Sequence, residues 1–166
     1  TQATHRNHVW TWDFIFDRTD KGSTLKMLTM LDEYTRQCLA IRVERQIRSG
    51  QVLATLWQAM MTYGIPEHIR SDNGSEFIAQ KIQEWLKESQ IKTLYIDPGS
   101  PWQNGYIESF HSRFRDECLN REWLLNLREA RVVIEDWRQY YNIERPHSRL
   151  GYLSPEGFIA NQNVSL

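Results

Sequence analysis

The chain has 166 residues, of which 40% are hydrophobic and 12% aromatic, so one domain can bury a core without disulfides or structural metals. It contains no run of about eighteen apolar residues that could span a bilayer and no secretory signal pattern, so we expect a soluble cytoplasmic protein with no membrane partner. Twenty Lys and Arg against twenty-one Asp and Glu give a net charge of −1, which is unusual for a stand-alone nucleic-acid binder.

The first third of the chain predicts three β-strands. Residues 9–16 read VWTWDFIF, a run of aromatic and apolar residues typical of a strand, with the acidic Asp13 inside it. A polar loop over 17–23 leads to two further strand-like runs, residues 24–31 and 37–43. Because the connections are short, we expect these three strands to form an antiparallel meander.

The hydrophobic period then changes to that of a helix. Apolar residues recur at helical spacing over 52–61, and Gly64 followed by Pro66 marks the end of this helix. The pattern next predicts a short strand, a second helix and a fifth strand, over residues 67–71, 75–89 and 92–96. Crossover helices of this kind force the later strands to be parallel.

The last third predicts a loop, two helices and an irregular tail. The segment DPGSPWQNG, residues 97–105, has two prolines and two glycines and is expected to have little intrinsic order. Helices follow over 104–120 and 127–141, and the tail over 141–159 is predicted to be a loop with one short helical turn.

This order of elements predicts the fold class. A five-stranded mixed sheet satisfies it, with strands 1–3 antiparallel, strands 4–5 parallel and helices on both faces. This α/β arrangement is the layout of the ribonuclease-H-like fold, and we predict a single domain over residues 1–166.

Three carboxylates are candidates for a metal site, although each has an ordinary explanation. Asp13 sits in an apolar strand, where an ionised carboxylate is costly unless it is paired, binds metal or points to solvent. Asp72 follows the fourth strand, a typical functional position, but Asp-Asn-Gly is also a common turn. Glu108 lies in the first turn of a helix, where acidic residues are common for electrostatic reasons.

Together, the three carboxylates are far more specific. They occupy three different elements, with 58 residues between Asp13 and Asp72 and 35 between Asp72 and Glu108. In the predicted fold the first and fourth strands are neighbours, so these side chains can converge. Oxygen ligands alone favour Mg²⁺ or Mn²⁺, and two such ions roughly 3.5–4 Å apart can promote in-line phosphoryl transfer.

The sequence resembles the DDE transposases and retroviral-type integrases, most closely the IS3-family insertion-sequence transposases. The resemblance covers nearly the whole chain and rests on the blocks WTWDF, LTMLDEYTR, IRSDNGSEF, QNGYIESF, RDECL and YNIERPHSRLGY. The interval before Glu108 matches the D,D-35-E pattern of that family. The resemblance makes Asp13, Asp72 and Glu108 catalytic residues and metal ligands of a polynucleotidyl transferase that cleaves and joins DNA.

The resemblance also implies partners and context. The substrates would be double-stranded transposon ends and target DNA, processed by a homo-oligomer associated with the prokaryotic nucleoid. Because the expected N-terminal helix-turn-helix DNA-binding region is absent, we expect the chain to be an excised catalytic core. The alternatives are a ribonuclease-H-like or resolvase-type nuclease that hydrolyses without joining, and a non-catalytic domesticated DNA-binding module.

Residues near the carboxylates are candidate DNA contacts. Arg115 and His111 share a helix face with Glu108, and the loop before this helix is expected to order when DNA binds. The predicted contacts are Asn73, Gln103, Asn104, Tyr106, His111 and Arg115. For Asn73 a purely structural turn is the alternative.

Other conspicuous residues are interpreted as structural. The block from Arg145 to His147 is interpreted as a packing corner in preference to a DNA contact. His5 and His8 are taken as surface histidines, and Cys38 and Cys118 as reduced, structural residues. Except for Trp102 in the loop, the tryptophans are predicted to face the core, namely those at positions 10, 12, 57, 85, 123 and 137.

Overall fold

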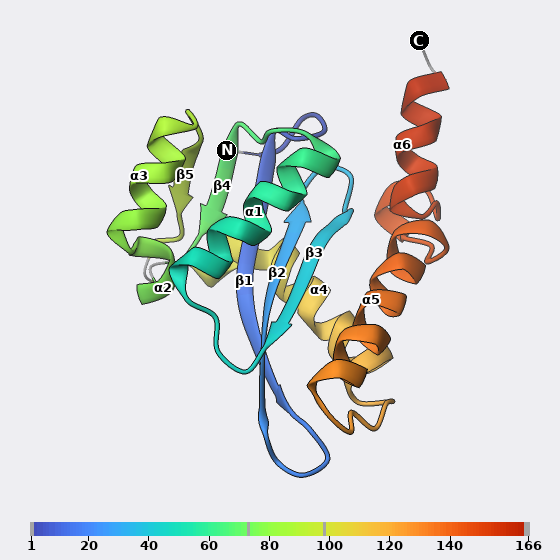
Figure 1. Cartoon of the computed structure of the whole chain (residues 1–166). Helices are drawn as coiled ribbons and strands as arrows, with labels where there is room; N and C mark the ends of the chain where they lie inside the picture. Colours follow the sequence, from blue (N-terminus) through green and yellow to red (C-terminus); the bar gives the residue numbers. More distant parts are fainter. Residues whose placement is uncertain (1, 73, 98, 165–166) are drawn as a thin grey trace.

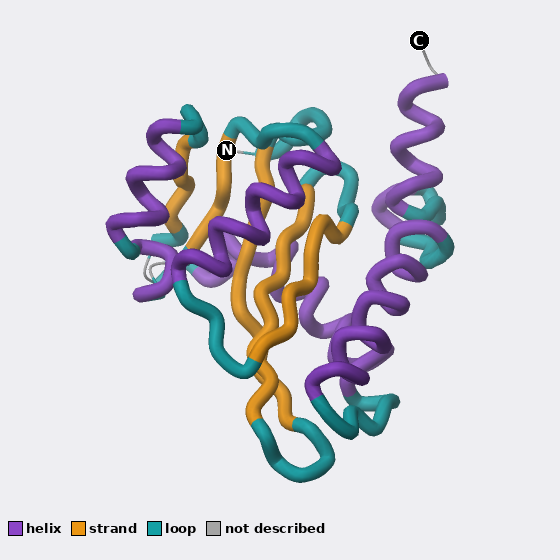
Figure 2. Tube along the Cα trace, viewed as in Figure 1, coloured by secondary structure: helices purple, strands orange, loops and turns teal. Residues whose placement is uncertain are grey.

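Five strands form one mixed sheet in the computed structural model, which describes residues 2–72, 74–97 and 99–164 (Figures 1 and 2). The strands are β1 (Val9–Arg18), β2 (Thr24–Asp32), β3 (Cys38–Glu44), β4 (His68–Ser71) and β5 (Lys92–Tyr95). Their order across the sheet is β3-β2-β1-β4-β5. Strands β1 to β3 pair antiparallel, whereas β4 runs parallel to β1 and to β5. The predicted sheet is therefore confirmed.

Helices cover both faces of this sheet (Figure 1). They are α1 (Ser49–Tyr63), α2 (Ser75–Ile78), α3 (Gln80–Glu88), α4 (Gly105–Phe114), α5 (Leu127–Ile143) and α6 (Pro155–Val164). Shorter turns are the 3₁₀ turns η1 (Pro101–Asn104) and η3 (Ser148–Leu150), and the π-helical turn η2 (Arg115–Leu119), which extends α4.

Two predicted helical boundaries are wrong. The single helix expected over 75–89 is broken at Ala79, whose backbone is extended with φ −52° and ψ 137°. The tail contains the ten-residue helix α6 in place of one short turn. Here the Ser154 hydroxyl accepts a hydrogen bond from the Gly157 backbone at 3.1 Å, and Pro155 opens the helix. Hydroxyl capping and an N-terminal proline favour helix initiation, which outweighs Gly157.

The hydrophobic core is divided between the two faces of the sheet because strand side chains alternate. Trp10 and Trp12 of β1 pack with residues of α1 and α3. Ile15, on the opposite face of the same strand, packs with Ile107 and Phe110 of α4 and with residues of α5. By the same alternation, Asp13 faces α4.

Not every tryptophan is in this core. Trp10, Trp12 and Trp137 are buried as predicted. Trp57 on α1 and Trp123 in the loop before α5 are 54% and 77% exposed, so the prediction of core positions is wrong for these two. The helical period places Trp57 on the outer flank of α1, where no other element of the described chain buries it.

Helix α5 protects the outer edge of β3. The Asn142 amide accepts a hydrogen bond from the Cys38 backbone N and donates to its carbonyl, both at 2.8 Å. The Arg138 guanidinium also donates to that carbonyl. Such capping satisfies the polar groups of an edge strand. Cys38 and Cys118 are both buried and free, as predicted. None of the helices in the described part of the chain has the length and hydropathy of a membrane span.

Candidate metal centre

The strand register brings Asp13 and Asp72 together. In the parallel pair of β1 and β4, Val9 is opposite His68 and Thr11 is opposite Arg70. Continuing this register by two residues places Asp13 level with Asp72, which directly follows the end of β4. The prediction that the first and fourth strands are neighbours is confirmed.

Electrostatics show that Glu108 is near the same pair. Burial is the largest cause of a rise in the pKa of the Asp13 carboxyl to about 6, although a hydrogen bond from the Phe14 backbone at 2.8 Å opposes it. The charges of Asp72 and Glu108 and a carboxyl-to-carboxyl hydrogen bond with Asp72 raise this pKa further. Repulsion of this kind requires the three carboxylates to lie close together.

A backbone amide fixes the Asp72 carboxylate. Asp72 Oδ1 accepts a hydrogen bond from the Gly74 backbone N at 2.8 Å. A Cβ atom at Gly74 would lie 2.9 Å from the same oxygen, which is closer than real Cβ atoms approach. A side chain at position 74 would therefore force the Asp72 carboxylate to shift, although the φ angle of Gly74, −58°, is open to any residue.

This contact gives a first testable prediction. Gly74→Ala should displace the Asp72 carboxylate and weaken Mn²⁺ binding by about 10- to 100-fold, the usual effect of losing a group that orients a ligand. The measurement is a Mn²⁺ titration followed by the thermal unfolding temperature. Gly50→Ala is the matched control, because its added Cβ would make only an ordinary contact, 3.6 Å from Lys81 Nζ. Equal Mn²⁺ affinity in both variants would contradict the assigned role of Gly74.

Two hydrogen bonds tie α4, and with it Glu108, to the sheet. The buried Asn104 Oδ1 accepts from the Thr11 hydroxyl at 3.3 Å, just before α4 begins. His111 Nε2 lies 2.7 Å from the hydroxyl of Thr29, which is opposite Asp13 in β2. Glu108 itself is exposed, whereas Ile107 beside it is buried. Glu108 is thus held near Asp13 by its helix and not by contacts of its own.

The donor set fits a hard divalent cation. Among the described residues, the salt bridges do not include Asp13, Asp72 or Glu108, so the negative charge at this place has no protein cation paired with it. Oxygen ligands without nitrogen or sulfur are what Mg²⁺ and Mn²⁺ prefer. In the described chain no three such side chains are already arranged as a complete ion site. Asp13 of β1 lies level with Asp72, which directly follows the neighbouring strand β4, and Glu108 is near enough to raise the pKa of Asp13.

The predicted DNA-contact residues differ in where the structure places their side chains. Asn73 lies outside the described residues. Arg115 donates to the Phe16 carbonyl at 3.1 Å, and Tyr106 lies beneath the Arg36 guanidinium at 4.1 Å. The side chains of Asn104 and His111 are engaged inside the domain by Thr11 and Thr29.

The loop over 97–105 has more structure than expected. Gln103 accepts a hydrogen bond from the Asp97 backbone at 2.8 Å and donates to the Asp97 carboxylate at 3.2 Å. The 3₁₀ turn η1 and the buried Asn104 follow. The described part of this loop thus contains a short turn and local hydrogen bonds, and its ordering on DNA stays a prediction. Trp102, by contrast, is 73% exposed.

Sequence reasoning missed Thr29. This residue has no exposed surface and its hydroxyl donates to the Asp13 carbonyl at 3.2 Å while contacting His111. A threonine in an apolar strand is common, so its type gave no signal. Pairing the first two predicted strands would have placed it opposite Asp13.

The block from Arg145 to His147 packs inside the domain. The Arg145 guanidinium binds the Glu117 carboxylate at 2.6 Å. His147 is buried against the Tyr141 ring, and burial is the main cause that lowers the pKa of its imidazole to about 4. These contacts support the interpretation as a packing corner. At the other end of the chain, His5 is exposed and bonds Glu67, in agreement with a surface position.

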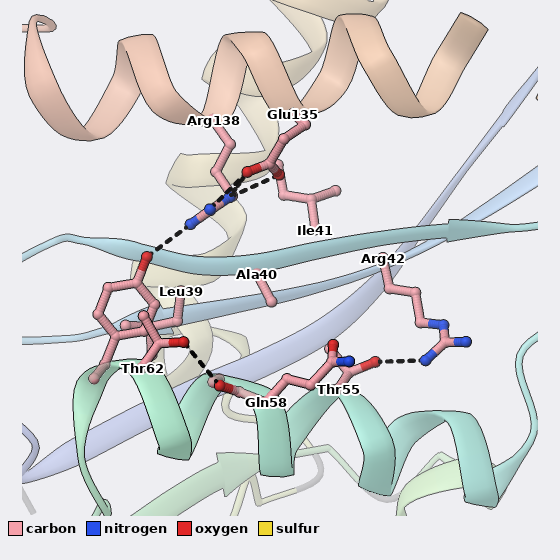
Figure 3. Close-up of a pocket in the computed structure, with 11 residues that line it drawn as sticks. Leu39, Ala40, Ile41, Arg42, Thr55, Gln58, Thr62, Glu135 and Arg138 are labelled. Atoms are coloured by element: carbon pink, nitrogen blue, oxygen red, sulfur yellow. Dashed lines mark hydrogen bonds and ion pairs between the residues drawn. The ribbon is translucent and has the colours of Figure 1, made fainter. Parts of the chain in front are cut away.

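A pocket of about 400 Å³ lies elsewhere, at the β3 edge between α1 and α5 (Figure 3). Arg138 crosses it to bond Glu135 at 2.7 Å and the Tyr63 hydroxyl at 3.0 Å. Neither Asp13, Asp72 nor Glu108 lines this pocket. It is therefore separate from the carboxylate cluster.

Two family models, each described as an integrase core domain, match residues 3–101 and 89–155 of this chain. The chain is 43% identical over 155 residues to an uncharacterized protein of insertion element IS476 from Xanthomonas euvesicatoria, covering 93% of this chain and 45% of that protein. It is 40% identical over 159 residues to a protein of insertion element IS407 from Burkholderia multivorans, covering 96% and 57%. The chain thus spans about half the length of these relatives.

Solved structures show the same fold. The HTLV-2 integrase catalytic core domain in complex with magnesium superposes with a TM-score of 0.64 at 20% identity, covering 92% of this chain and 94% of that one. The catalytic core domain of BIV integrase gives a TM-score of 0.71 at 20% identity, covering 96% and 98%. At this identity the likeness concerns the fold alone, and it confirms the predicted ribonuclease-H-like fold.

Proposed function

Because this chain belongs to the integrase core domain family, we propose that it is the catalytic domain of a transposase that cleaves transposon ends and joins them to target DNA. The observation that carries the proposal is the cluster of Asp13, Asp72 and Glu108, whose mutual repulsion contributes to the raised pKa of Asp13. The similarity to proteins of two bacterial insertion elements supports it.

The same three carboxylates are proposed to be the ligands of Mg²⁺ or Mn²⁺, with two ions in the active complex. These residues would hold the ions, which would supply activation of the attacking oxygen and charge neutralisation at the phosphate and the leaving oxygen. The chain supplies fixed ligands for them. Asp13 is held by its strand and by the Phe14 amide, and Asp72 by the Gly74 amide.

Each step forms one P–O bond and breaks another, so the proposed reaction needs no oxidant, reductant or other cofactor. In cleavage, water attacks the phosphorus, a new P–O bond forms, and the bond to the 3′-oxygen breaks to leave a 3′-hydroxyl. In joining, that 3′-hydroxyl attacks a target phosphodiester, and the target's own 3′-oxygen leaves with a proton. One site can perform both steps, because only the attacking hydroxyl differs.

We propose that three residues near this site contact DNA, namely Gln103, Tyr106 and Arg115. Arg115 lies seven residues, about two helical turns, after Glu108 and so shares its side of the helix. Its half-buried guanidinium is anchored on the Phe16 carbonyl, which positions it to contact a backbone phosphate beside the carboxylates.

The active assembly is proposed to contain at least two copies of the chain, because two transposon ends must be processed together. The HTLV-2 core has been solved in dimeric and trimeric forms, and a simian T-cell lymphotropic virus intasome superposes with a TM-score of 0.81 at 15% identity, covering 93% of this chain and 55% of that one. Recognition of the transposon end is assigned to a separate DNA-binding region, and the site of action to the prokaryotic nucleoid.

A strand-transfer assay tests the proposal. The complete transposase is incubated with Mg²⁺, pre-cut transposon ends and a target plasmid, and joined products are measured on gels. We expect joined products that disappear when the metal is chelated. Hydrolysis with no joining would favour the nuclease alternative, and binding with neither reaction would favour the domesticated DNA-binding module.

A further inference from the structure

His111 occupies an unusual position on α4. It follows Glu108 by three residues, between the exposed flank that carries Glu108 and the buried flank of Phe110 and Phe114. Its ring is half-buried and points at β2, where its Nε2 atom lies 2.7 Å from the hydroxyl of the fully buried Thr29. Moving polar groups from water into this apolar layer costs free energy, so a buried pair of this kind calls for an explanation.

The Thr29 hydroxyl extends this contact to Asp13. It lies 3.2 Å from the Asp13 carbonyl oxygen, which can only accept a hydrogen bond. When the threonine hydrogen is directed at Asp13, the hydroxyl oxygen accepts from His111, in the tautomer that carries its proton on Nε2. Burial, followed by the nearby Arg115 charge, lowers the pKa of His111 to about 4, so the ring is neutral at neutral pH.

Helix α4 is consequently attached to the sheet at two points that bracket Glu108. Before Glu108, Asn104 bonds Thr11 of β1. After it, His111 bonds Thr29 of β2. Thr11 lies two residues before Asp13 and Thr29 lies opposite it, so both attachments are made to the side chains of residues next to Asp13 in the sheet.

We propose that His111 is a positioning residue, which holds Glu108 at the correct distance from Asp13 by donating Nε2–H to Thr29, while Thr29 donates to the Asp13 carbonyl. This inference rests on the proposed function of the three carboxylates. It gives His111 a role inside the protein that differs from the DNA contact predicted from the sequence. Supporting bonds of this kind set the geometry of metal ligands that are otherwise free to rotate.

The test uses variants that remove one bond each. Thr29→Val removes the hydroxyl at nearly constant volume, and His111→Phe removes the donor while keeping a planar ring. Each should weaken Mn²⁺ binding and strand transfer by about 10- to 100-fold. Thr29→Ser and His111→Gln retain a hydroxyl or an N–H donor and should recover most of both. Thr55→Val is the matched control, because Thr55 is buried in α1, away from the carboxylates.

The double variant distinguishes positioning from general destabilisation. If the two residues act through one chain of hydrogen bonds, Thr29→Val with His111→Phe should lose no more Mn²⁺ affinity than either single variant. Additive losses, or a Mn²⁺ affinity equal to that of Thr55→Val, would overturn the inference. The Mn²⁺ titration uses thermal unfolding and needs no DNA. If the unaltered protein binds Mn²⁺ but never joins DNA, the proposed function fails while His111 is still tested.

Discussion

Glu108→Gln should reduce DNA cleavage and joining by about a thousandfold or more in Mg²⁺, with the domain still folded. The change removes one negative charge at almost constant volume. A loss of this size corresponds to about 4 kcal/mol of transition-state stabilisation, which is typical when the electrostatic support of a phosphoryl transfer is removed. Because Glu108 is exposed and makes no hydrogen bond or salt bridge among the described residues, the free energy of unfolding should change by only about 0.5 kcal/mol.

The measurement compares cleavage and joining rates of the complete protein with and without the change. Asp136→Asn, an exposed carboxylate on α5, is the matched control and should keep the rate of the unaltered protein. Asp72→Asn should lose activity to the same degree as Glu108→Gln. Full activity of Glu108→Gln would show that the third ligand has been assigned to the wrong residue.

Asp13→Asn should abolish activity but stabilise the metal-free domain at neutral pH. Burial and two neighbouring carboxylates raise the pKa of Asp13 from 3.8 to about 6, so its charged form is disfavoured in the folded state. Each pKa unit corresponds to about 1.4 kcal/mol, which makes the expected gain on the order of 1–3 kcal/mol. For a domain of this size, each kcal/mol raises the unfolding temperature by about 2–4 °C.

The sign of the pH dependence follows from linkage. The folded state holds the Asp13 proton more tightly than the unfolded state, so this stabilising contribution is complete below about pH 4 and is lost as pH rises to about 6. The difference in unfolding temperature between Asp13→Asn and the unaltered protein should therefore be small near pH 4 and largest above pH 6. Taking this difference removes the opposite contribution of His111 and His147, whose pKa values are lowered.

Divalent cations provide the complementary measurement. At pH 7.5, Mn²⁺ at about a hundred times its dissociation constant should stabilise the unaltered protein by about 2.7 kcal/mol. Asp13→Asn should lose most of this gain, because one anionic ligand is missing. The same Mn²⁺ stabilisation in both proteins would place the ion elsewhere, and an unchanged metal-free unfolding temperature would mean that Asp13 is not under electrostatic strain.

The sequence was sufficient for the types of most elements, while its assignment of three carboxylates to a metal site stays a prediction. The alternation in WTWDF and the helical spacing over 52–61 are local patterns, and local patterns are imposed by the backbone geometry of strands and helices. The sequence could predict that Asp13 and Asp72 lie close together, because the order of the elements predicts that the first and fourth strands are neighbours in the sheet. The predictions were wrong for the exposure of Trp123 and for the helix break at Ala79, which residue type and spacing did not indicate.

Local sequence patterns specified the mixed sheet, most of its helices and the placement of three carboxylates on separate elements. Contacts between segments far apart in the chain set how Asp13 and the helix that carries Glu108 are held. The chain from His111 through Thr29 to Asp13 depends on strand register and helix placement, whereas the contact between Gly74 and Asp72 spans two residues and belongs to a local turn. Such placement results from packing on both faces of the sheet, which brings together residues far apart in the sequence, such as Thr29 and His111, 82 positions apart. No local pattern encodes a distance of that kind.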